Sequence, residues 1–215
     1  MGSRIKIFIM SKLLAINGKI GSGKDTIAKI IIGLAAQEIS HYPSSMQTIW
    51  EVKKFAGKLK EIASLLTGIN IADFEDQEFK KSFLPDEWNI IPKYEWGDEP
   101  KDPRMTVRTF LQKLGTEALR DGLHTNVWVN ALFSDYTVNS NWLITDCRFT
   151  NEYDAIKQRG GLIIRVNRVT GNPVSNHPSE TSLDNHKFDY VIDNNGSLTD
   201  LESQVKIFLK DFNLV

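Results

Sequence analysis

The chain has 215 residues, of which 41% are hydrophobic and 25% charged, and its formal net charge is -1. This length and apolar content are enough for one substantial core with an inserted lobe, and an aromatic content of 10% argues against extended disorder. A duplex-DNA binder usually carries a strong basic excess, so the balanced charge excludes that class and predicts no nucleic-acid polymer as a partner.

The cysteine content and the N-terminal segment bear on location. Cys147 is the single cysteine, so no disulfide can form within the chain, and a reducing cytoplasm is the expected compartment. The apolar residues 5–10 are too few to span a bilayer, so no membrane partner is expected. Met1 and Met10 are both candidate starts.

Short apolar strands alternate with amphipathic helices along the chain. Strands are predicted at residues 12–17, 48–55, 142–145, 162–166 and 190–193. Helices are predicted from residue 24 onward and at residues 56–66, 107–123, 126–136, 151–159 and 197–212, with Thr106, Thr125 and Ser197 as N-caps. Residues 73–104, rich in acids, aromatics and prolines, are expected to form an irregular surface excursion, and residues 167–185 a mobile loop. The alternation predicts an α/β fold with a parallel sheet covered by helices on both faces.

Residues 18–24 match the phosphate-binding pattern Gly-x-x-x-x-Gly-Lys, between a predicted strand and a predicted helix. Gly18, Gly21 and Gly23, with Ser22, allow backbone N–H groups to surround a phosphate, and the helix N-terminus adds partial positive charge. Lys24 would reach the β- and γ-phosphates of ATP. A plain glycine-rich turn is the alternative, and the lysine with its flanking elements disfavours it.

The position after the lysine departs from the usual pattern. Asp25 stands where a magnesium-ligating Ser or Thr is common, and Thr26 follows it. Either side chain is a candidate Mg²⁺ ligand, because a carboxylate can bind the ion directly or through water. Asp25 can equally be a first-turn acid that the helix dipole favours.

Four stretches of the chain resemble the bacteriophage deoxynucleoside monophosphate kinases. They are residues 17–28 (NGKIGSGKDTIA), 106–130 (TVRTFLQKLGTEALRDGLHTNVWVN), 144–152 (ITDCRFTNE) and 177–196 (HPSETSLDNHKFDYVIDNNG). The resemblance implies a three-layer P-loop kinase fold that transfers the γ-phosphate of ATP to a dNMP, giving dNDP and ADP for DNA synthesis, with Mg²⁺ as cofactor. Residues 73–104 lie outside the resemblance, and Asp25 departs from the usual loop.

In the third stretch, the resemblance assigns two residues to phosphate chemistry. Asp146, at the end of a strand, would organise Mg²⁺, and Arg148 would stabilise the transferring charge. The alternatives are a turn-capping acid for Asp146 and an ion pair of Arg148 with Asp146 or Glu152. Glu152 would orient an arginine or contact the acceptor, or else be a first-turn acid, and Asn151 is expected to cap the helix.

The second stretch supplies candidates for binding the acceptor. Arg108 and Gln112 are four residues apart, hence on one helix face, and suit a monophosphate and a base edge. An ordinary solvated face is the alternative. Trp128 would stack on a base or serve as a core residue. Arg120 is a further acceptor candidate, again with a solvated face as the alternative. Walls of the acceptor cleft, with a buried Phe beside solvated lysines as the alternative, would be Phe55, Lys58 and Lys60.

The remaining expectations concern the lid and the domain division. Arg168, and less strongly Arg165, would belong to a lid over the triphosphate at about residues 167–185. Asn194 would lie near the adenine, with a plain turn as the alternative. Ser179 and Glu180 match a family signature without an assigned role. We expect one domain, with a core at about 12–72 and 140–215 and an acceptor-binding insertion at about 73–139.

Two other functions stay open at this point. One is a P-loop kinase of another small acceptor, of the phosphomevalonate or dephospho-coenzyme A type. The other is a nucleotide-dependent switch or binding module, although the guanine-reading pattern Asn-Lys-x-Asp is absent from the sequence. Nucleotides are the expected partners, and the sequence leaves a homodimer open.

Overall fold

The computed structural model describes residues 12–39, 50–89, 104–137, 140–169 and 178–214. The chain divides into two compact units, Met1–Phe55 with Leu132–Val215 (unit 1) and Ala56–Ala131 (unit 2). Unit 2 thus begins and ends earlier than the insertion expected at residues 73–139. Among the described residues, no helix combines the length and the apolar composition that a membrane crossing needs.

Unit 1 is built on a five-stranded parallel sheet in the order β2-β3-β1-β4-β5. The strands are β1 (Leu13–Gly18), β2 (Trp50–Lys53), β3 (Asn141–Ile144), β4 (Leu162–Asn167) and β5 (Tyr190–Asp193). In the central register, Ala15 of β1 pairs with Ile144 of β3 and Ile163 of β4. All six residues of β1 are buried. The predicted parallel sheet is therefore confirmed; the predicted start of the second strand, at residues 48 and 49, lies outside the described residues.

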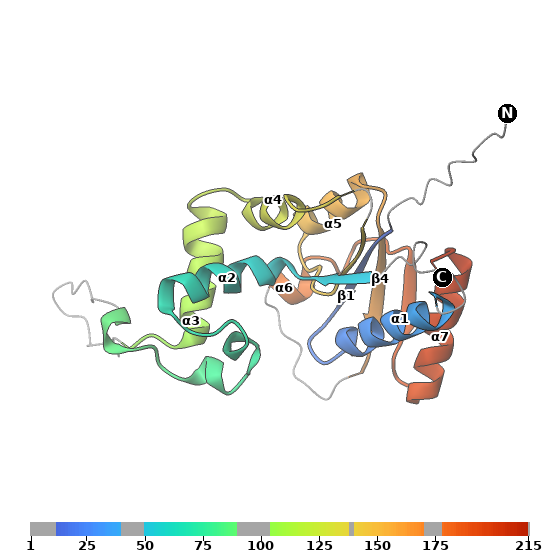
Figure 1. The fold of residues 1–215 in the computed structure, drawn as a ribbon, viewed down its shortest axis with the longest axis horizontal. Helices are drawn as coiled ribbons and strands as arrows, with labels where there is room; N and C mark the ends of the chain where they lie inside the picture. Colours follow the sequence, from blue (N-terminus) through green and yellow to red (C-terminus); the bar gives the residue numbers. More distant parts are fainter. Residues whose placement is uncertain (1–11, 40–49, 90–103, 138–139, 170–177, 215) are drawn as a thin grey trace. The chain divides into compact units, whose positions relative to one another are not determined.

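One face of this sheet packs on two helices, α1 (Lys24–Ile39) and α7 (Leu198–Asp211), which lie side by side (Figure 1). Because side chains alternate along a strand, Leu14 and Ile164 point to this face. There they join Ile31 of α1 and Phe208 of α7, which have no exposed surface. Ser197 caps α7 as predicted, since its side chain accepts the N–H of Asp200.

The opposite face carries the alternate residues of the same strands. Trp142 stacks on Phe133, the last residue of α4 (Val127–Phe133), with ring centroids 6.0 Å apart. Gly161 lies against Leu13 and Ile156 of α5 (Thr150–Gln158), where an added Cβ would be 3.0 and 2.6 Å from their side chains. Helices therefore cover both faces, and the expected three-layer α/β fold is confirmed.

The segment predicted as a mobile loop at residues 167–185 contains a helix in its second half. Residues 178–181 form the short helix α6 (Pro178–Thr181), followed by turns that lead to β5. Residues 170–177, the middle of the predicted loop, lie outside the described residues. The prediction of a loop was wrong at residues 178–181, where contacts with distant segments, described below, hold a stretch that has no hydrophobic periodicity.

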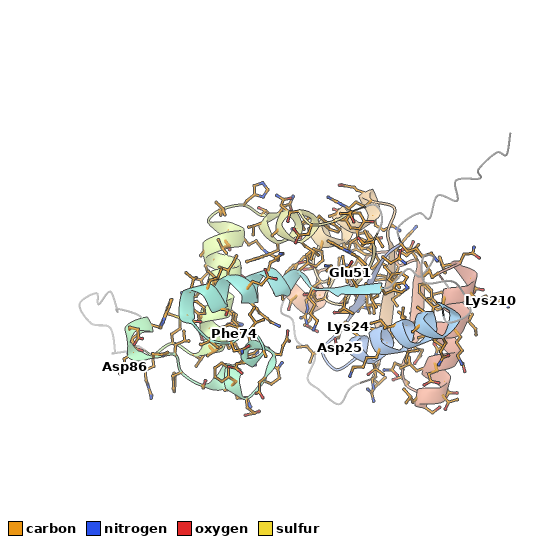
Figure 2. All side chains as sticks on the ribbon, in the orientation of Figure 1. Lys24, Asp25, Glu51, Phe74, Asp86 and Lys210 are labelled. Carbon is orange, nitrogen blue, oxygen red and sulfur yellow. The ribbon has the colours of Figure 1, made fainter. Side chains whose placement is uncertain are left out.

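Unit 2 has a core of its own, formed by α2 (Phe55–Thr67), three 3₁₀ turns and α3 (Val107–Gln112). The turns are Asp73–Glu75, Phe79–Lys81 and Asp86–Trp88. This irregularity confirms the expectation for the described part of residues 73–104, whereas residues 90–103 lie outside it. The excursion is not only a surface feature, however: Phe74 is fully buried and packs with Ala63 and Phe110 (Figure 2).

The helix predicted at residues 107–123 changes its hydrogen-bond register halfway. Thr106 caps α3 as predicted, and from Lys113 to Asp121 the chain continues as a π-helix, η5. Gly115 lies so close to α2 that an added Cβ would be 2.9 Å from the Leu59 side chain. The carbonyl of Gly115 accepts the indole N–H of Trp128 at 2.8 Å. The π-helix thus contains a backbone carbonyl, that of Gly115, which accepts a side-chain hydrogen bond. A hydrophobic pattern does not encode such a change of helix type.

Candidate active site

The phosphate-binding loop lies between β1 and α1, the setting that the sequence predicts. Gly18 is the last residue of β1, and Lys24 is the first residue of α1. Gly21 and Gly23 have φ angles of 77° and 96°, a backbone conformation that other residues rarely adopt. Lys24 and Asp25 lie together at the start of α1 (Figure 2). The N-terminus of a 16-residue helix therefore opens onto this loop.

Two side chains that are distant from the loop in sequence form hydrogen bonds with its backbone. Asn194, which follows β5, is buried and donates its amide N–H to the carbonyl of Ser22 at 2.8 Å. Glu180 of α6 accepts the backbone N–H of Ile20 at 2.8 Å. Asn194 thus contacts the loop itself, and its expected place beside an adenine stays a prediction. Ser22 is buried within the loop.

The ammonium of Lys24 binds backbone carbonyls of the loop, and its pKa is lowered. Its ammonium donates to the carbonyls of Gly18 at 2.6 Å and Lys19 at 2.9 Å. Burial, followed by the positive charge of Arg148, lowers the pKa of Lys24 to about 8, while Glu180, Asp25 and Asp146 act in the opposite direction. The contacts agree with this direction, since Asp25 follows Lys24 on α1, and Glu180 binds both the loop N–H of Ile20 and the guanidinium of Arg148.

Asp146 and Arg148 follow β3 and are fixed by different partners. One carboxylate oxygen of Asp146 accepts the backbone N–H of Phe55, the first residue of α2, at 2.8 Å. Nη1 of Arg148 forms an ion pair with Glu180 at 2.9 Å. Arg148 thus forms its side-chain ion pair with Glu180, whereas the sequence suggested Asp146 or Glu152.

Glu152 is buried at the start of α5, where it accepts the backbone N–H groups of Arg148 at 2.8 Å and Phe149 at 3.1 Å. These bonds satisfy donors at the helix N-terminus, so they support the first-turn role of this acid. The expectation that Asn151 caps the helix was wrong. The N-cap position is Phe149, Asn151 lies inside the first turn, and Glu152 supplies the acceptor that a capping side chain would give.

The candidate metal ligands are oxygen donors near Lys24. Asp25 and Thr26 are exposed on the first turn of α1, and Asp146 is partly exposed. The described residues contain no group of three or more His, Cys, Asp and Glu side chains arranged for a metal. Mg²⁺ does not need one, since it is commonly bound by one or two carboxylates together with substrate phosphates and water. The donor set therefore fits Mg²⁺.

Three acceptor candidates of unit 2 remain open to solvent. Arg108 and Gln112 are both exposed on α3, and a guanidinium nitrogen of Arg108 donates to Gln77 at 3.2 Å. Lys58 is partly exposed on α2 and pairs with Glu61 at 3.4 Å. This geometry leaves the acceptor role of these side chains a prediction.

The other acceptor candidates are buried or partly buried. Trp128 is 5% exposed and bonded to Gly115, which supports the alternative of a core tryptophan. Phe55 is 3% exposed and meets Phe133 edge-on at 6.3 Å. Lys60 is buried and paired with Glu75, and Arg120 is partly buried in η5.

The two lid arginines differ in their surroundings. Arg168 is exposed just beyond β4. Arg165 is fixed within unit 1: its guanidinium donates to the side chain of Asn17 and forms an ion pair with Asp184 at 2.8 Å. Asn17 in turn donates to the carbonyl of Cys147 at 2.8 Å. Arg165 therefore has a bracing position beside the loop, and Arg168 is the one that stays a lid candidate.

Sequence reasoning assigned no role to Asn17, Glu180 or Asp184. Asn17 precedes the first loop glycine at the carboxyl end of the central strand, where ligands of parallel sheets bind. Glu180 and Asp184 belong to the stretch HPSETSLD, whose two acids are four residues apart. Position at a strand end and acid spacing were thus available signals.

Comparisons with known proteins show the family of the chain. Residues 56–205 match the family model of deoxynucleotide monophosphate kinase, which is more than half of the chain. An Acanthamoeba polyphaga mimivirus protein, provisionally named a deoxynucleotide monophosphate kinase, is 29% identical over 209 residues, covering 90% of this chain and 93% of its own. The deoxynucleoside-5'-monophosphate kinase of Escherichia phage T5 is 24% identical, covering 81% of this chain and 86% of its own. The deoxynucleotide monophosphate kinase of Enterobacteria phage T4 is 31% identical over 114 residues, 51% of this chain and 47% of its own. The chain belongs to the deoxynucleotide monophosphate kinase family.

Proposed function

We propose that this chain transfers the γ-phosphate of ATP to a deoxynucleoside monophosphate and releases dNDP and ADP. The observation that carries the proposal is that Lys24 binds carbonyls of the phosphate-binding loop, while Glu180 links the same loop, through the N–H of Ile20, to the guanidinium of Arg148. A binding module needs the loop and its lysine, whereas transfer also needs cationic groups where charge develops on the moving phosphoryl group. Membership of a kinase family supports the same reading.

Phosphoryl transfer requires positioning and positive charge more than proton transfer. The backbone N–H groups of the loop and the Lys24 ammonium would hold the β- and γ-phosphates. Arg148 would contact the equatorial oxygens of the transferring group, where negative charge spreads in the transition state. The phosphate of a dNMP is anionic near neutral pH, so it attacks the γ-phosphorus directly, and Asp146 need not act as a base.

Magnesium would lie among the oxygen donors of Asp25 or Thr26 and Asp146, where it supplies charge neutralisation for the triphosphate. Asp146 is held in place by the N–H of Phe55, so its carboxylate has a fixed orientation. Asp25 sits on the exposed first turn of α1, next to Lys24. Both acids therefore have positions compatible with binding Mg²⁺. Removal of Mg²⁺ by chelation with EDTA should stop phosphoryl transfer.

For the acceptor, we propose Arg108 and Gln112 as the main contacts of unit 2. They share the exposed side of α3, and their spacing of four residues puts a bidentate phosphate binder beside an amide that suits a base edge. Lys58 and Arg120 are secondary candidates, while the burial of Phe55 and Trp128 favours a supporting role. Glu152, which accepts the backbone N–H groups of Arg148 and Phe149, would act by fixing the Arg148 segment.

The cytoplasm of a host cell supplies ATP and dNMPs, and we propose it as the place of action. ADP release in a coupled assay tests the activity, with Mg-ATP as donor and dNMPs, NMPs, phosphomevalonate and dephospho-coenzyme A as acceptors. Turnover on one or more dNMPs supports the proposal and gives the base preference. Turnover on another acceptor alone would refute the proposed substrate, and acceptor-independent hydrolysis would favour a switch.

A further inference from the structure

Glu180 is a buried carboxylate to which the proposed reaction assigns no task. Its side chain is 5% exposed, and it lies on α6, more than 150 residues from the phosphate loop in sequence. One oxygen accepts the backbone N–H of Ile20 in the loop at 2.8 Å. The other oxygen accepts Nη1 of Arg148 at 2.9 Å.

A carboxylate at this depth is costly unless charged or polar partners compensate for lost hydration. Both partners of Glu180 belong to the phosphate site, one to its loop and the other to its proposed transfer arginine. A guanidinium has five N–H donors, and Glu180 engages it at one terminal nitrogen, so the same arginine can also bind phosphate oxygens. The side chain of Arg148 is 33% exposed, and without this anchor it would gain rotational freedom.

A second carboxylate on the same segment provides a comparison. Asp184 pairs with Arg165 at 2.8 Å and with Lys19 of the phosphate loop at 3.2 Å. Asp184 is more exposed than Glu180, and its ion pairs are with Arg165 and Lys19 instead of Arg148. Both acids therefore fasten residues 180–184 to the region of the loop, whereas Glu180 also binds Arg148.

We propose that Glu180 is a positioning residue for phosphoryl transfer, which holds the Arg148 guanidinium and the Ile20 turn of the loop in the geometry that the transition state requires. The inference rests on the role of Arg148 in the proposed function. A misplacement of about 1 Å in a catalytic group can cost roughly 100-fold in rate, so the anchor of an arginine has a measurable effect.

The test is a double-mutant cycle of Glu180→Gln and Arg148→Ala, with initial rates measured at varied ATP. We expect Glu180→Gln to lower kcat by about 10–100-fold and to change KM for ATP by less than about threefold, because the contact with Arg148 matters most when charge develops. In the Arg148→Ala background the same change should cost less than about threefold, since the group that it positions is gone. Equal losses in both backgrounds, or wild-type kcat for Glu180→Gln, would overturn the proposal.

Two comparisons separate positioning from general damage. Glu202→Gln, on α7, removes a partly buried acid from another part of unit 1 and should leave kcat within about twofold. Asp184→Asn loosens the same segment, so a loss as large as that of Glu180→Gln, with no coupling to Arg148, would contradict the specific role of Glu180. If Glu180→Gln does not unfold cooperatively, Glu180→Asp replaces it in the cycle. Because Glu180→Asp keeps the charge, its kcat should lie between that expected for Glu180→Gln and that of the wild type. Wild-type kcat in Glu180→Asp would refute the proposal. Wild-type protein without dNMP turnover would instead refute the proposed function.

Discussion

Gly23→Ala adds a single carbon atom, Cβ, to the phosphate loop, and its effect on the free energy of unfolding follows from the structure. Gly23 has a φ of 96°, so any side chain there is strained, which costs about 1–3 kcal/mol. The new Cβ would also lie 2.4 Å from the amide nitrogen of Asn194, which must move and give up its buried hydrogen bond to Ser22. That bond contributes about 0.5–1.5 kcal/mol, so the free energy of unfolding should fall by about 2–4 kcal/mol in total.

The assay is thermal unfolding together with ATP-dependent turnover. At this chain length the destabilisation corresponds to a Tm lower by about 5–15 °C, and turnover should fall because the loop N–H groups lose their arrangement. Gly33→Ala is the matched control: Gly33 lies in α1, and no atom lies within 4 Å of an added Cβ. It should raise stability by up to about 1 kcal/mol. An unchanged Tm and turnover in Gly23→Ala would refute the reasoning.

The same reasoning predicts non-additivity. Asn194→Ala removes the amide that the new Cβ would strike, so the double variant with Gly23→Ala should be more stable than the sum of the two single losses predicts. The double variant should then lose more unfolding free energy than Asn194→Ala alone only by the backbone strain at residue 23. Strict additivity would show that the loop moves away from Asn194 instead of meeting it.

Four further outcomes are expected. Lys24→Ala should lower kcat by at least about 100-fold while the unfolding transition stays near wild type, and wild-type turnover would contradict its proposed role. Burial and Arg148 lower the pKa of Lys24 to about 8, so kcat/KM for ATP should fall as the pH rises through 8; a profile that is flat to pH 9.5 would oppose this. Phe74→Ala should cost about 3–5 kcal/mol of stability in urea unfolding because Phe74 is fully buried in the unit 2 core, and a loss below about 1 kcal/mol would be inconsistent with that packing. Ser197→Ala should cost about 1 kcal/mol because α7 loses its cap, unlike Ser203→Ala on the exposed face of the same helix.

Local patterns predicted most of unit 1. The apolar run before Gly18, the glycines and the helical spacing after Lys24 are each encoded within a few residues, and the structure reproduces them as β1, the loop and α1. The cap at Ser197 belongs to the same class, because a serine three residues before Asp200 is a local capping signal. Such features depend on neighbours in sequence, which is why one sequence was enough for them.

Predictions failed where a distant partner decides. The stretch with Glu180 has no hydrophobic period, yet α6 forms there, and its acid binds Ile20 and Arg148, which are 160 and 32 residues away. For Trp128 the sequence left a stacking role and a core role open, and the structure bonds its indole N–H to Gly115 in a π-helix. Composition cannot distinguish these environments, since the same residue types suit both an open site and a packed interior.

Topology could have narrowed that gap. Once a parallel sheet is predicted, the carboxyl ends of all its strands must meet at one edge. Asn17 in β1, Asp146 after β3, Arg165 in β4 and Asn194 after β5 are polar residues at or near those ends. Considered together, they predict a polar network around the loop, and all four have hydrogen bonds that link separate segments of unit 1: Asn17 to Cys147, Asp146 to Phe55, Arg165 to Asn17, and Asn194 to Ser22. The polar residues at the strand ends thus carried information about the site that no single motif contains.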